Sequence, residues 1–120
     1  KELLQFVKSI LPNDIILNND RKHIKPYNVD ILVLDKNIII EYFGDYWHAN
    51  PILYDENKIL VYHNVPTPVK TIWEYDNKRK LFCENSGYKY IIVWEYDWLK
   101  NKDYIKSYLK SILLDELTIP

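Results

Sequence analysis

The sequence predicts an α/β (α+β) fold, in which a mixed sheet of four to five strands is flanked by helices. Three observations predict it. Apolar residues recur at helical spacing near the start of the chain, two neighbouring runs are rich in β-branched residues, and a third such run follows a long helical segment. The 120 residues suit one domain, and the hydrophobic content of 48% is enough for a folded core.

The first elements are a helix and a short strand. Residues 1–11 are predicted to be an amphipathic helix, because their apolar residues fall on one helical face. Pro12 is expected to end this helix. The apolar run 14–17 predicts a strand, and the polar stretch 18–20 predicts a turn.

The centre of the chain is predicted to form an antiparallel hairpin. Its strands are the β-branched runs 29–34 and 37–43, which only Asp35 and Lys36 separate. Gly44 is expected to end the second strand. Residues 50–66 have little periodicity and contain two prolines, so they are predicted to be a loop.

The second half alternates helix and strand. It is predicted to contain a helix from Pro68 to about Ser86, a strand from Tyr88 to Trp94, and a helix that starts at Asp103 and ends near Leu114. Thr67 is the expected cap of the first of these helices, with Pro68 in its first turn. Gly87 suits the position just past its end.

Net charge limits the classes of function. The formal net charge is −1 and the isoelectric point is about 6.3, whereas strong non-specific DNA binding normally comes from many Lys and Arg contacts to phosphate. A stand-alone high-affinity DNA binder is therefore not expected. A DNA-cutting domain remains compatible, because the negative charge of a carboxylate cluster is offset when metal and substrate bind. We expect another domain or chain to supply much of the affinity.

Cysteine content and apolar runs indicate a cytoplasmic protein. The single cysteine, Cys83, cannot form an internal disulfide, which fits a reducing cytoplasm. No apolar run is long enough to span a bilayer, and no signal peptide is visible. Because the sequence begins at Lys1 and contains no Met, we expect residues 1–120 to be a single domain from a longer protein.

Two carboxylates and a histidine lie on or just after the predicted hairpin. Asp30 interrupts an apolar strand, where burial of a carboxylate is costly unless the group is paired or binds a cation. Glu41 lies on the neighbouring strand, and oxygen ligands from two such positions can form a site for a hard metal. His48 follows an aromatic cluster, and an imidazole can accept a proton from water near neutral pH. Each of the three also has a structural interpretation, as a solvated strand end or a packed histidine.

Three motifs resemble successive blocks of the very-short-patch repair (Vsr) endonucleases. They are Asp30-Ile-Leu-Val, Phe43-Gly44-x-x-Trp47-His48 and Gly87-Tyr-x-x-Ile-Ile-Val93-Trp94-Glu95. These nucleases belong to the PD-(D/E)xK superfamily, so the resemblance implies a restriction-endonuclease-like core. Within this group the sequence is most similar to phage homing endonucleases with a Glu-Asp-x-His-Asp signature, and the resemblance covers roughly residues 1–98.

The resemblance implies roles for individual residues. Asp30 matches the metal-binding Asp, His48 matches the His that activates water, and Asp76, eleven residues before Gly87, matches the final Asp. The variable position of the signature falls on Tyr42, whose backbone carbonyl would bind the metal. Glu41 is the alternative side-chain ligand, and only one of these adjacent side chains can point into the site.

The first Glu of the signature and the zinc site of the repair enzymes match less well. Glu2 is the candidate for that Glu, although alignment of Leu3 with the family's first core leucine would put it one residue before Lys1. Asn50 replaces the second His of the repair enzymes. A zinc site is not expected, because the only Cys and His residues are scattered along the chain: Cys83, His23, His48 and His63.

The resemblance predicts hydrolysis of double-stranded DNA with Mg²⁺, for which Mn²⁺ can substitute, and no membrane association. Arg21 and Lys78 are the candidate phosphate contacts, although a basic run on a helix is often only solvated. A mismatch-nicking repair enzyme is one alternative. An inactive nuclease fold that only binds DNA or protein is the other, because fold alone does not establish activity.

Overall fold

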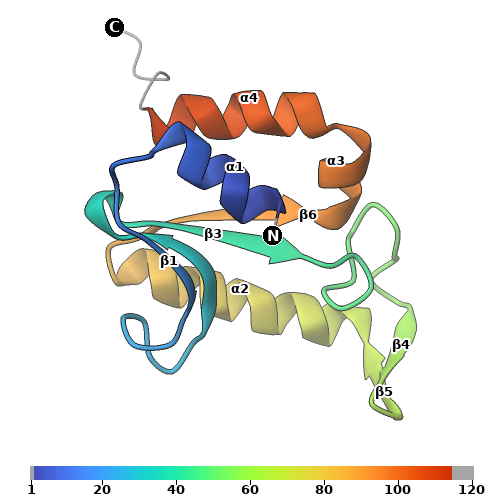
Figure 1. Ribbon diagram of the computed structural model, residues 1–120. Helices are drawn as coiled ribbons and strands as arrows, with labels where there is room; N and C mark the ends of the chain where they lie inside the picture. Colours follow the sequence, from blue (N-terminus) through green and yellow to red (C-terminus); the bar gives the residue numbers. More distant parts are fainter. Residues whose placement is uncertain (1, 115–120) are drawn as a thin grey trace, which may run out of the picture.

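The computed structural model describes residues 2–114, so Lys1 of the predicted first helix lies outside it. The fold is α+β, with a mixed four-stranded sheet, a separate two-stranded hairpin and four α-helices among the described residues. Helix α2 (Val69–Asn85) lies on one side of the sheet, and α1 (Glu2–Ile10) and α4 (Lys102–Leu113) lie on the other (Figure 1). The prediction of a mixed sheet flanked by helices is confirmed.

The sheet has the strand order β1-β2-β3-β6. Strands β1 (Ile16–Asp20), β2 (Val29–Val33) and β3 (Ile38–Phe43) are antiparallel neighbours, and β6 (Lys89–Trp94) runs parallel to β3. The predicted hairpin of the second and third strands is therefore confirmed. A parallel neighbour needs a crossover, and α2 provides it between β3 and β6.

The sheet separates two hydrophobic cores, because successive side chains of a strand point to opposite faces. One core joins the sheet to the N- and C-terminal helices and contains Leu3, Val7, Ile31, Val33, Ile38, Ile40, Ile91, Val93, Trp98, Leu109 and Leu113. The other core lies under α2 and contains Leu32, Ile39, Cys83 and Tyr90. Cys83 is buried, which agrees with a packing role.

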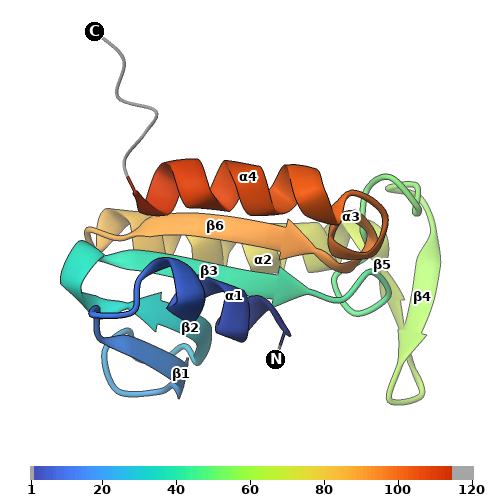
Figure 2. The same ribbon diagram turned by 45° about the horizontal axis from the view of Figure 1, so that its top comes forward.

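Two sequence predictions in the first two thirds of the chain are wrong. The stretch 18–20 is the end of β1, although Asn19 has a left-handed φ of 52°. Part of the predicted loop forms a hairpin of β4 (Ile59–Tyr62) and β5 (Val65–Pro68), which projects beyond the end of the sheet (Figure 2). The predicted strand 14–17 covers only the first residues of β1, because the rest of β1 is polar. The prolines of β5 are tolerated because this strand lies at the edge of its hairpin.

The helix starts also differ from the predictions. Helix α2 begins at Val69, and Thr67 donates its hydroxyl hydrogen bond to Val65 in the hairpin instead of capping the helix. A short helix α3 (Glu95–Lys100) was not predicted, and α4 begins at Lys102, with Asp103 in its first turn rather than at its cap. Gly87 has a φ of 97° and follows α2 as predicted. A 3₁₀ turn (Leu34–Lys36) joins β2 to β3.

None of the helices in the described part of the chain is long and apolar enough to cross a membrane.

Candidate active site

Asp30 lies where β2 and β3 separate. The paired register of these strands ends at Ile31 and Ile40, one residue before Asp30. The carboxylate then takes the place of a strand partner, because Asp30 Oδ2 accepts a 2.8 Å hydrogen bond from the backbone N–H of Tyr42. The other carboxylate oxygen of Asp30 has no hydrogen-bond partner among the described residues.

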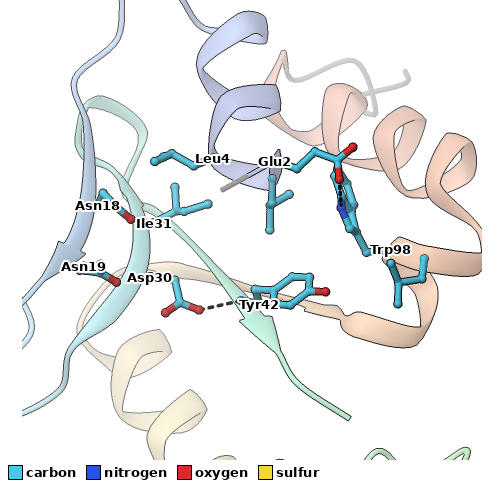
Figure 3. Close-up of a pocket in the computed structure, with 10 residues that line it drawn as sticks. Glu2, Leu4, Asn18, Asn19, Asp30, Ile31, Tyr42 and Trp98 are labelled. Carbon is cyan, nitrogen blue, oxygen red and sulfur yellow. Dashed lines mark hydrogen bonds between the residues drawn. The ribbon is translucent and has the colours of Figure 1, made fainter.

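A cavity of about 590 Å³ opens beside Asp30 (Figure 3). Its polar lining comes from Glu2 of α1, Asn18 and Asn19 of β1, Asp30 and Tyr42. Glu2 accepts hydrogen bonds from the indole of Trp98 and the ammonium group of Lys102, at 3.1 and 2.8 Å. The structure therefore brings together the predicted residues Glu2, Asp30 and Tyr42 at one cavity.

The environment of Asp30 opposes its ionisation. Burial raises the pKa of Asp30, and the negative charge of nearby Glu41 raises it further. The Tyr42 N–H and the charges of Arg79 and His48 lower this pKa but do not cancel the rise. A carboxylate in this position gains from a cation that replaces the lost solvation.

The side chain of Glu41 is part of a buried ion pair. It is 1% exposed, and its Oε2 accepts hydrogen bonds from Arg79 Nε at 2.9 Å, Arg79 Nη2 at 2.6 Å and the Tyr90 hydroxyl at 2.6 Å. Its Oε1 accepts from the Asp30 N–H at 2.9 Å. Because the Arg79 guanidinium binds this carboxylate and neutralises its charge, the structure does not favour Glu41 as the side-chain metal ligand that the sequence suggested.

His48 and Asp76 form a direct pair. His48 Nδ1 lies 2.9 Å from Asp76 Oδ2, and the His48 ring stacks on Phe43 with a centroid distance of 3.8 Å. Asp76 comes from α2, whereas His48 lies in the loop that follows β3. The stacking and the hydrogen bond fix both the plane and the rotation of the imidazole.

A set of hydrogen bonds holds the loop that carries His48. The buried amide of Asn50 donates to Asp45 Oδ1 and accepts from the Ile52 N–H, at 2.9 and 3.1 Å. Asp45 Oδ1 also accepts from the Tyr96 N–H, and the Asp45 N–H donates to Glu95. These contacts tie the loop to the start of α3.

Two further contacts fix the backbone next to His48. Ala49 is fully buried with a left-handed φ of 49°, a conformation that non-glycine residues adopt only when the surroundings impose it. The indole N–H of Trp73 donates a 2.7 Å hydrogen bond to the Ala49 carbonyl. The loop conformation therefore depends on α2 as well as on α3.

Asp30 and His48, to which the resemblance gives roles in one reaction, line different cavities. His48 and Asp76 line a second cavity of about 200 Å³, together with Phe43, Trp73, Asn77, Lys80, Ile92 and Trp94. Positive charge on His48 lowers the pKa of Asp30, but less than the Tyr42 N–H and the charge of Arg79 do. The lysine beside the His48–Asp76 pair is Lys80, one helical turn after Asp76, rather than the predicted Lys78.

The two predicted phosphate contacts lie outside both cavities. Arg21 follows β1 directly and Lys78 lies on α2, and both side chains are exposed. Among the described residues, neither forms an ion pair.

The donor set suits a metal ion that keeps most of its own waters. No group of three or more His, Cys, Asp or Glu side chains among residues 2–114 could hold a metal ion. Mg²⁺ does not need such a group, because it commonly binds through one or two carboxylates and retains several waters. Asp30 meets this requirement, because one of its carboxylate oxygens has no hydrogen-bond partner among the described residues and the side chain lines a cavity that has room for water.

Sequence reasoning missed three residues of this region: Arg79, Lys80 and Asn50. Arg79 and Lys80 stand three and four residues after Asp76, so helical spacing alone places them on the same side of α2 as Asp76. The run 78–80 instead suggested a uniformly solvated face. No local signal marks Asn50, whose partners come from the folded loop and not from a periodic pattern.

Comparison of this chain with protein-family models, with curated proteins and with solved structures gives no match.

Proposed function

We propose that this chain is the catalytic domain of a metal-dependent DNA endonuclease that hydrolyses phosphodiester bonds. One observation carries the proposal: near the end of β3, Asp30 binds the Tyr42 N–H, and the loop that follows β3 carries His48, which Asp76 and Phe43 hold in place. Phosphodiester hydrolysis needs a base that takes a proton from water and a carboxylate that binds a metal ion, and His48 and Asp30 are the residues proposed for these two roles. The motif resemblance to Vsr-like and phage homing endonucleases, with a restriction-endonuclease-like core, points to the same chemistry.

In the proposed reaction, His48 is the general base. If Asp76 accepts the Nδ1–H hydrogen bond, Nε2 carries the free lone pair and can take a proton from a water molecule. The water oxygen forms a bond to phosphorus as the bond to the leaving oxygen breaks, and solvent protonates the leaving oxygen. Asp76 holds the imidazole in the required tautomer and stabilises the imidazolium that forms.

Asp30 and the backbone carbonyl of Tyr42 would hold the Mg²⁺ ion, for which Mn²⁺ can substitute. When bound, the ion would polarise the phosphate and orient it as a Lewis acid. Glu2 lines the same cavity and its carboxylate stays anchored by Trp98 and Lys102, so it would act on water or substrate at the cavity wall. Glu41 would act indirectly, because it holds the Asp30 N–H.

The alternatives have different requirements. A mismatch-nicking repair enzyme of the Vsr type would carry a structural zinc site, and the described residues contain no suitable His and Cys cluster. An inactive binding module would have no use for a fixed histidine–aspartate pair. A separate DNA-binding domain is proposed as the partner, because the net charge of −1 does not by itself provide strong affinity.

The decisive experiment incubates the protein with supercoiled and linear double-stranded DNA at low salt, with Mg²⁺, Mn²⁺ or a chelator. Metal-dependent cleavage that His48→Ala removes is the expected result. Absence of cleavage with either metal at high protein concentration would overturn the proposal, provided that circular dichroism shows folded protein. Equal cleavage of matched and T·G-mismatched duplexes would separate this proposal from the repair alternative.

A further inference from the structure

The segment between β1 and β2 concentrates positive charge on a nearly neutral protein. Residues 21–28 contain Arg21, Lys22, His23 and Lys25 and no acidic residue. The side chains of Arg21, Lys22 and Lys25 are exposed. Because the whole chain has a net charge of −1, this local excess of cations is balanced by acidic groups elsewhere.

The same segment is firmly held by its surroundings. Asp20, at the end of β1, accepts hydrogen bonds from the His23 N–H at 2.9 Å and lies 3.0 Å from His23 Nδ1. Burial opposes ionisation of Asp20, but the contacts with His23 outweigh it and lower the pKa of Asp20. Ile24 is buried in the core under α2. An ordered segment loses less conformational entropy when it binds a partner than a flexible one does.

Helix α2 packs against this segment and contributes a fourth cationic side chain, Lys78. The ring of Tyr27 packs edge-on against Phe82, with a centroid distance of 5.3 Å, and Arg79 donates a hydrogen bond to the Asn28 carbonyl. Lys78 lies one helical turn before Phe82, so it stands on the side of α2 that faces the segment. Arg21, Lys22, Lys25 and Lys78 are here called the basic surface. None of the four forms an ion pair with any residue in the range 2–114.

The segment that carries three of the four cations connects β1 and β2, and both strands contribute residues to the cavity of Asp30. Asn18 and Asn19 line that cavity (Figure 3), only Asp20 separates them from the start of the segment, and Asp30 follows two residues after the segment ends. A bound polymer that places a phosphate at Asp30 would therefore continue across these cations. Exposed, unpaired cations beside such a cavity are complementary to a polyanion.

We infer that the basic surface binds the phosphate backbone of double-stranded DNA and so holds the duplex beside Asp30. This inference rests on the proposed function, and it names the surface by which that site receives its substrate. Contacts to phosphate carry no base information, so this surface would hold DNA of any sequence. A separate domain would then select the target.

The test measures binding and not cleavage. Fluorescence anisotropy with a labelled duplex, in Ca²⁺ or chelator, gives the slope of log K against log salt. The variant Lys22→Gln/Lys25→Gln is expected to reduce this slope by about two units, because each lost phosphate contact contributes about 0.9. Lys22→Arg/Lys25→Arg, which keeps both charges, should retain it.

The matched control removes two exposed lysines from the opposite side of the sheet, Lys8 on α1 and Lys110 on α4. Lys8→Gln/Lys110→Gln should leave the slope unchanged. An equal loss in this control, or no loss in Lys22→Gln/Lys25→Gln, would overturn the inference. Anionic phospholipid vesicles that bind as tightly as the duplex, with the same dependence on Lys22 and Lys25, would also overturn it.

The two proposals fail in different ways. Salt-dependent binding that needs the basic surface but never leads to cleavage would contradict the endonuclease and support the surface. Cleavage that is lost in His48→Ala but unaffected by Lys22→Gln/Lys25→Gln at moderate salt would support the endonuclease and contradict the surface.

Discussion

His48 Nδ1 and Asp76 Oδ2 lie 2.9 Å apart, although 28 residues separate them in the chain. This contact joins the loop after β3 to α2 and orients the imidazole that we propose as the general base. The five predictions below concern this contact, its neighbours and the basic surface.

Loss of the imidazole should nearly abolish activity. We expect His48→Ala to reduce the rate of DNA cleavage by roughly 10²–10⁴-fold, the usual contribution of a general base. Asp76→Asn should also slow cleavage, because an amide that donates to Nδ1 would leave the proton on Nε2. Single-turnover cleavage measures both effects. Unchanged cleavage in His48→Ala would make His48 structural and leave water activation to the metal.

Removal of the Asp30 charge should abolish cleavage without loss of stability. The pKa of Asp30 is raised in the folded state, so folded protein holds this proton more tightly than the unfolded chain does. The free energy of unfolding therefore falls as pH rises through the folded-state pKa. Asp30→Asn keeps the acceptor for the Tyr42 N–H, and at neutral pH its Tm should match or exceed that of the wild type.

The pH dependence of the Tm difference between Asp30→Asn and the wild type is the control for this prediction. Below the ordinary pKa of an aspartate, Asp30 is protonated in both states, and the stability difference between Asp30→Asn and wild type should vanish. Thermal unfolding of both proteins in chelator, at several pH values, measures it. A Tm of Asp30→Asn well below wild type at neutral pH would show that the charge of Asp30 stabilises the fold.

The ion pair of Glu41 and Arg79 should matter for folding more than for chemistry. Arg79→Ala leaves the buried carboxylate of Glu41 without its cation, and loss of one partner of a buried pair typically costs about 3–5 kcal/mol. Urea unfolding measures this cost. The adjacent exposed residue gives the control, since Lys78→Ala should change stability by less than about 0.5 kcal/mol.

A double variant tests whether the unpaired charge of Glu41 causes the loss of stability expected for Arg79→Ala. Glu41→Gln/Arg79→Met removes both charges, so it should recover part of the stability that Arg79→Ala loses. If instead Arg79→Ala folds normally and only Mg²⁺ dependence changes, then Glu41 is a metal ligand after all.

Asn50 should position His48 through the loop. Asn50→Ala leaves the Ile52 N–H and one acceptor site of Asp45 without their partner, at a cost of about 1–3 kcal/mol. The His48 ring should then lose its fixed stacking on Phe43. NMR would detect this as a reduced ring-current shift of the His48 ring protons, and cleavage should slow in parallel. An unchanged shift would limit Asn50 to a purely structural role.

Substitution of Lys78 should affect mainly DNA binding and substitution of Lys80 mainly the rate of cleavage, although the two residues are near neighbours on α2. Lys78→Ala should weaken duplex binding and reduce the salt slope by about one unit or less, the contribution of one phosphate contact. Lys80 lines the cavity of His48 and Asp76, so Lys80→Ala should slow cleavage more than it weakens binding. Anisotropy and single-turnover cleavage separate the two effects. The reverse pattern would exchange the roles assigned here.

Periodicity in the sequence was sufficient to predict the central elements. The runs 29–34 and 37–43 are strands because β-branched side chains pack on both faces of a sheet, and this preference acts between near neighbours in the chain. The polar second half of β1 and the strand β5 were missed, since polar residues and prolines there have the composition of turns. The start of α2 was predicted one residue too early, because Thr67 and Pro68 have the composition of a helix start but belong to β5.

The sequence by itself determined the centre of the main sheet, the long helix α2 and the residue types of the candidate site. Only the tertiary structure decided what each acidic side chain does. Glu41 and Asp30 look alike in sequence, but Arg79 reaches Glu41 across 38 residues and neutralises it, which leaves Asp30 as the carboxylate with an open oxygen. Local patterns depend on neighbouring residues, whereas the partner of a buried charge depends on which element packs over it. Here the element that packs over Glu41 is α2.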